Sequence, residues 1–154
     1  MSTSATTLAP RFRRALYDAA TDLFAGEAVG VTLGPPSGLP DQLVTIGPVK
    51  GTQDVATMGP ARSREETLTC EVLISCATGG GGEVDADLDD DAYGLMGRLE
   101  YYTRVTDTTL GGVVRHCFLT EHVSDGTQPD DQTGGRWIAI IATFTAHGRV
   151  RGAL

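Results

Sequence analysis

Two stretches of the chain repeat apolar residues with the spacing of a single helix face. In the first, Pro10 suits the first helical position and Gly26 suits the residue just beyond the last. In the second, the aspartates of 85–91 precede the apolar stripe, where the helix dipole favours negative charge. The spacing therefore predicts helices over about 10–25 and about 86–106. Their apolar faces are formed by Phe12, Leu16, Ala19, Ala20 and Leu23, and by Leu88, Ala92, Leu95, Leu99 and Tyr102.

Five further stretches are typical of β-strands. The clearest is 66–77, because its apolar residues alternate strictly with polar ones and so share one face. Shorter patterns predict strands over about 29–33, 43–46, 113–123 and 137–146. The last of these is apolar on both faces, and we therefore expect a central strand that is covered on both sides. Its two faces are formed by Ile138, Ile140, Ala142 and Phe144, and by Trp137, Ala139 and Ile141.

The connections between these elements are rich in glycine. Residues 47–64 show no sustained period, and a loop of this length in a compact domain usually binds something or moves. It carries Val55 and Met58, two apolar residues that the core does not require. Residues 79–82 form a flexible glycine connector and 124–135 an acidic loop.

The order helix, three strands, helix, two strands predicts an α+β domain. Its sheet of about five strands is mainly antiparallel, with both helices packed on one face. A chain of 154 residues is long enough for one domain, which buries about 70% of the surface that the unfolded chain exposes. We expect a single domain over 1–154, with 1–9 and 148–154 as flexible or assembly-dependent tails.

The charge and the cysteines narrow the function classes. Twelve basic residues against twenty acidic ones give a net charge of −8, which argues against a dedicated nucleic-acid-binding protein. Three cysteines at unpaired spacing, in apolar strands, predict reduced and buried thiols. No stretch resembles a membrane span or a signal peptide. The first helical turn nevertheless carries Arg11, Arg13 and Arg14, at the end where the dipole disfavours cations. They are either solvated charges or a docking patch for an acidic surface or a phosphate backbone.

No motif in the sequence specifies catalysis, a cofactor or a metal. The glycines of 79–82 lack the Lys-Ser/Thr ending of a phosphate-binding loop. A calcium loop that started at Asp85 would need Gly and Glu where Asp90 and Met96 stand. The three histidines lack metal-ligand spacing, and no nucleophile motif occurs. We therefore expect no cofactor and no enzymatic activity, while a catalytic site assembled from scattered residues stays an alternative.

Nearly the whole chain resembles the tail terminator (tail completion) proteins of long-tailed bacteriophages. The resemblance rests on Arg64-Glu65-Glu66 leading into the strand within 62–74, on Thr108-Thr109-Leu110-Gly111-Gly112 after the second helix, and on a final apolar strand that ends in Thr145-Ala146. It implies a sheet with flanking helices and a hexameric ring on the finished tail tube, which stops tube polymerisation and joins the tail to the head connector. It implies no catalytic residue and no cofactor. The expected partners are further copies of the chain, the tail tube protein and the head-tail connector protein, in a virion assembled in the host cytoplasm.

A closed ring needs two different complementary surfaces on each subunit, and it encloses a lumen through which DNA passes without specific binding. The lumen charge would come from Asp130 and Asp131 or from the aspartates of 87–91. Alternatives are a connector, stopper or tube subunit, or a monomeric bacterial ligand-binding or enzymatic domain. The candidate interface residues are Arg11, Arg13, Arg14, Val55, Met58, Arg62, Arg64, Gly94, Gly97, Leu110, Gly111, Gly112, Asp130 and Asp131.

Overall fold

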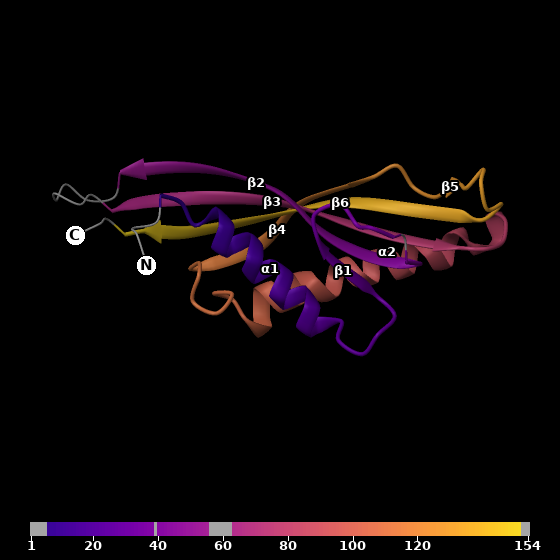
Figure 1. Cartoon of the computed structure of the whole chain (residues 1–154), viewed down its shortest axis with the longest axis horizontal. Coiled ribbons are helices and arrows are strands. Elements are labelled where there is room, and N and C mark those ends of the chain that lie inside the picture. The colour runs from indigo at the N-terminus through magenta and orange to yellow at the C-terminus, as the bar shows by residue number, and fades with distance from the viewer. Residues whose placement is uncertain (1–5, 39, 56–62, 152–154) are drawn as a thin grey trace.

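The computed structural model describes residues 6–38, 40–55 and 63–151, which form one sheet with both helices on the same side (Figure 1). Across the sheet the strand order is β1-β2-β3-β6-β4, and β5 pairs with β6 at one end. Only β1 and β2 pair in parallel; the other described pairings are antiparallel. The elements are α1 (Ala9–Leu23), β1 (Gly30–Leu33), β2 (Gln42–Val55), β3 (Arg64–Thr78), α2 (Asp85–Tyr101), β4 (His116–Ser124), β5 (Gln128–Pro129) and β6 (Arg136–Val150). The predicted α+β class, its mainly antiparallel sheet and the order of its long elements are confirmed.

The core lies between the two helices and the inner face of the sheet. Strict alternation along β3 and β6 places every second side chain in this layer. Phe12 and Leu16 of α1 and Leu99 of α2 meet it at 1% exposure or less. A π-helical turn, Tyr102–Thr106, continues α2, so the predicted helical stretch is matched along its length. The buried strand residues include Leu68, Val72, Ile74, Ile138, Ile140, Ala142 and Phe144.

The three cysteines form part of this core and are free thiols, as expected. Burial raises the pKa of Cys70 and of Cys117 to about 12, and that of Cys76 to about 11. A thiol reacts as its thiolate, so these side chains act as small apolar fillers near neutral pH.

The predicted loop over 47–64 is wrong for its first half. Strand β2 continues to Val55 and pairs with β3 as far as Arg64. A β-bulge between Ile46 and Val49 accommodates Gly47 and Pro48, at the point where β1 stops and β2 becomes a sheet edge. Proline is tolerated in a sheet at bulges and edges, so its presence did not end the strand. Residues 56–62, with the candidates Met58 and Arg62, lie outside the described residues.

The predicted tail over 148–154 is also wrong in its first residues. Strand β6 runs to Val150, and its last three residues pair with Arg64, Glu65 and Glu66 of β3. Backbone pairing carries this extension, because β3 is long enough to offer partners beyond the apolar pattern. The loop over 124–135 is likewise interrupted by the two-residue strand β5.

The first turn of α1 is stabilised by a buried carboxylate from the sheet. Glu66 of β3 is 2% exposed, and its oxygens accept the Leu8 N–H at 2.6 Å and the Thr7 hydroxyl at 2.5 Å. Gln53 donates a third hydrogen bond at 3.0 Å. Gly51 leaves the space, because a Cβ there would lie 2.9 Å from a Glu66 oxygen. A negative charge at this end of α1 offsets the arginines of its first turn.

Candidate functional site

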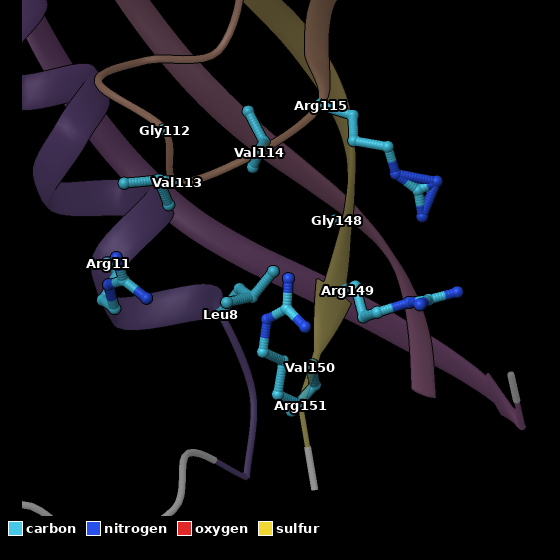
Figure 2. Close-up of a pocket in the computed structure, with 10 residues that line it drawn as sticks. All are labelled: Leu8, Arg11, Gly112, Val113, Val114, Arg115, Gly148, Arg149, Val150 and Arg151. Atoms are coloured by element: carbon cyan, nitrogen blue, oxygen red, sulfur yellow. The ribbon is translucent and has the colours of Figure 1, made fainter. Parts of the chain in front are cut away.

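A basic hollow lies where the start of α1, the segment before β4 and the end of β6 meet (Figure 2). Its volume is about 410 Å³, and four arginines line it: Arg11, Arg115, Arg149 and Arg151. Figure 2 shows Arg115 and Arg149 pointing to the same side, whereas the guanidinium of Arg151 turns back toward Leu8. The hollow therefore gathers cations from three elements that are far apart in the sequence.

The positive charge of this basic hollow is only partly neutralised. Arg115 and Arg149 both pair with Glu65, the latter at 3.1 Å, so two guanidinium groups share one carboxylate. Arg11 and Arg151 are exposed, and neither forms an ion pair with any residue in 6–38, 40–55 or 63–151. Guanidinium groups form bidentate hydrogen bonds with carboxylates and phosphates, so the hollow is suited to an anionic partner.

The turn after α2 forms one wall of the hollow and has an unusual backbone. Leu110, Gly111 and Gly112 all have positive φ, of 48°, 70° and 88°, a conformation that costs a leucine energy. Leu110 is nevertheless only 4% exposed, and its burial in the core fixes the turn. Asp107 accepts the Gly111 N–H at 3.1 Å and rigidifies it further.

A second hollow, of about 340 Å³, continues from the first beside this turn and is lined by Arg11, Arg14, Leu110 and Gly111 among others. The structure thus brings together five of the candidates singled out from the sequence: Arg11, Arg14, Leu110, Gly111 and Gly112. Sequence analysis missed Arg115, Arg149 and Arg151. The spacing of Arg149 and Arg151 at the end of a predicted strand was the only signal for them.

An acidic stripe runs along the outward side of α2. Asp87, Asp90, Gly94 and Gly97 follow one another at intervals of three and four residues, and all four are exposed. A Cβ at either glycine would meet nothing within 4 Å. Close approach of α2 to the sheet is therefore not the reason for these glycines, which leaves contact with a neighbouring subunit as the other explanation.

The outer face of the sheet is uncovered along β3, β6 and β4. Leu73, Ile141 and Val123 lie side by side in one row across these three strands. Trp137 and Phe118 add to it, and the side chains of Phe118, Val123, Trp137 and Ile141 are between 38% and 56% exposed. The expectation that this central strand is covered on both sides is thus wrong for the isolated chain. We call these five residues the open apolar face.

The other candidates lie apart from the hollows or at their margins. Arg13 turns to the sheet and donates to the carbonyls of Gly47 at 2.8 Å and Ile46 at 3.1 Å. Val55 is 65% exposed at the end of β2, opposite Arg64 at the start of β3.

Asp130 and Asp131 lie in the loop after β5. The Asp130 side chain accepts the N–H groups of Gln132 and Thr133, and hydrogen bonding, first from the Thr133 side chain, lowers the Asp130 pKa. Asp131 is exposed. These contacts shape the loop and leave the lumen assignment as a prediction.

The described part of the chain offers little that resembles a metal or membrane site. Within 6–38, 40–55 and 63–151, no three His, Cys, Asp or Glu side chains lie close enough to hold a metal ion together. No helix among the described residues is long and apolar enough to cross a membrane. Asp85, the first residue of the suspected calcium loop, instead forms a two-contact ion pair with Arg136 at 2.8 and 2.9 Å, which lowers the Asp85 pKa.

No family model matches the chain, and no curated protein matches it either. Among solved structures, the chain is similar to a chain from the virion of a native gene transfer agent particle, with a TM-score of 0.40 and 13% sequence identity. The alignment covers 94% of this chain and 100% of that chain. The function of the chain is therefore argued from its own residues and surfaces.

Proposed function

We propose that the chain is a structural protein of a phage-type virion, which forms a hexameric ring at the head-proximal end of the tail tube. There it ends tube polymerisation and offers its opposite side to the head connector. The observation that carries the proposal is the open apolar face, a row of large side chains that the isolated chain leaves in water. Contiguous exposed apolar patches usually mark surfaces that another protein covers. The sequence resemblance to tail terminators indicates which kind of assembly that is.

The distribution of surfaces is also consistent with a ring. Head-to-tail closure requires two different surfaces on each subunit, and the chain has a basic hollow, an acidic helix stripe and an open apolar face. A stable interface covers about 800 Å² on each partner. The chain exposes 8745 Å² in total, so it has ample room for two neighbours in the ring and two along the axis. This role requires no catalytic residue and no cofactor.

The experiment that tests the proposal adds the purified chain to tail tube protein while the tube polymerises. Electron microscopy then measures the distribution of tube lengths and detects a cap. We expect shorter tubes, each closed at one end by six copies. A tube subunit would instead be incorporated and lengthen the tubes, while a head-tail stopper or connector would leave their length unchanged.

Two variants connect the experiment to the open apolar face. Ile141→Lys replaces an exposed apolar side chain in the middle of the row and should abolish capping without changing the melting temperature. Thr52→Lys, on the exposed end of β2, adds the same charge outside the row and should cap as the wild type does. If the chain leaves tube length unchanged and turns over a small molecule as a monomer, the enzymatic alternative replaces the proposal.

A further inference from the structure

The chain carries its opposite charges at opposite ends of its long axis. The basic hollow lies at the end where β6 finishes, whereas α2 starts at the other end, after the far end of β3 (Figure 1). Asp87, Asp89, Asp90 and Asp91 occupy the first turns of α2 and are all exposed. None of these four aspartates pairs with an arginine or lysine in the described ranges. The overall charge of −8 conceals this polarity.

We infer that two copies of the chain associate head to tail, with the acidic start of α2 of one copy seated in the basic hollow of the next. This inference rests on the proposed ring and assigns the charged contact that closes it. The occupant is a second copy because the chain itself displays the complementary charge, at a place where its own hollow cannot reach it. A concave surface with four guanidinium groups and one carboxylate fits a convex helix turn with several uncompensated carboxylates.

The glycines of α2 provide a second argument for the same contact. Asp87, Asp90, Gly94 and Gly97 share one side of the helix, so the side that offers the carboxylates also lacks side-chain bulk beyond them. A glycine in an exposed helix costs about 1 kcal/mol relative to alanine, and nothing within the described chain uses the space that Gly94 or Gly97 leaves. Close approach of a neighbouring backbone explains both positions.

Charge reversal of each surface tests the inference with the full chain. The hollow variant carries Arg11→Glu and Arg151→Glu, two exposed residues whose described surroundings contain no ion pair to break. The helix variant carries Asp87→Lys and Asp90→Lys. Sedimentation velocity measures self-association at low and high salt, since the Debye length falls from about 30 Å at 0.01 M to about 3 Å at 1 M.

We expect the wild type to associate at low salt and to dissociate at high salt. Each variant alone should associate at least about tenfold more weakly, as is typical for reversal of close interfacial charges. An equimolar mixture of the two variants should recover, because an alternating arrangement restores opposite charges at every contact. One chain that carries all four reversals should also recover. Lys50→Glu, a reversal of an exposed charge on β2, is the matched control and should associate as the wild type does.

The inference is overturned if the wild type stays monomeric at low salt, if either variant associates normally, or if the mixture fails to recover. It is also overturned if the hollow variant associates normally but loses retention of a double-stranded DNA fragment, because the hollow would then bind phosphates. Tube capping separates this result from the proposed function. Variants that associate normally, in a protein that still caps tubes, refute the contact alone, whereas charge-swap recovery in a protein that never caps tubes refutes the function alone.

Discussion

The buried carboxylate of Glu66 allows a quantitative test of how the sheet fixes α1. Glu66→Gln keeps the size of the side chain and removes its charge, and Glu66→Ala removes the group. In the wild type the carboxylate accepts hydrogen bonds from Leu8, Thr7 and Gln53 at 2.5 to 3.0 Å, at the end of α1 where peptide N–H groups lack helical partners. Both variants should therefore lower the free energy of unfolding.

The magnitudes follow from the contacts. A hydrogen bond to a charged group contributes about 1.5–3 kcal/mol and a neutral one about 0.5–1.5 kcal/mol. The helix dipole adds about 0.3–1 kcal/mol for a charge at this position. We expect Glu66→Gln to destabilise the chain by about 1–3 kcal/mol. Glu66→Ala also leaves the buried Leu8 N–H without its acceptor, and its cost should be about 3–5 kcal/mol.

Urea denaturation at pH 7, followed by circular dichroism, measures both values. For a chain of this length about 1 kcal/mol lowers the melting temperature by about 2–4 °C, which gives a second readout. Glu65→Gln is the matched control, because Glu65 is the adjacent residue, is partly exposed and forms only surface ion pairs, whose contribution is about 0–1 kcal/mol. If Glu66→Gln and Glu66→Ala both unfold like Glu65→Gln, the carboxylate does not stabilise α1 and the reasoning is refuted.

Three further predictions concern other contacts. Arg13→Ala removes the donor to the Ile46 and Gly47 carbonyls and should cost about 1–3 kcal/mol in urea denaturation, whereas Arg14→Ala should change stability by less than about 0.5 kcal/mol; equal values would refute the assignment. Gly47→Ala should destabilise the chain by about 1–3 kcal/mol, because its Cβ would lie 2.7 Å from the Glu71 carbonyl oxygen, while Gly94→Ala should stabilise the monomer by about 0.5–1 kcal/mol and weaken self-association; a stable Gly47→Ala chain would contradict the bulge geometry. Burial, with smaller contributions from His147 and Arg115, lowers the pKa of His116, so the unfolded chain binds a proton more readily and stability should fall as the pH drops below about 6.5; His116→Gln should lessen this fall in denaturation midpoints between pH 5 and pH 8, and an unchanged slope would refute the assignment.

The sequence predicts the inner layer of the fold well, because core side chains leave a periodic signal. Strand β3 is found from its alternation, and α1 from its spacing between Pro10 and Gly26. The second half of β2 leaves no such signal. Its side chains are mostly exposed and its pairing with β3 is carried by the backbone, so Gly47, Pro48 and Gly51 suggested a loop.

The surfaces are harder to predict because they depend on which elements become neighbours. Arg11 and Arg14 were singled out for their position in a helix, and Leu110 with its two glycines for a turn. Only the fold shows that these segments line adjoining hollows. The apolar outer side of β6 was visible in the sequence, but its alternation gives the same signal whether a part of the same chain or another protein covers it.

The three core thiols make the chain suitable for single-site labelling. With their pKa values at about 11 to 12, almost no thiolate forms at pH 7, and maleimide reagents would react first with a cysteine introduced at the surface. Fluorophores or spin labels can thus be attached without replacing any native residue. One label on α2 and another on the turn before β4 would report the spacing between adjacent subunits directly.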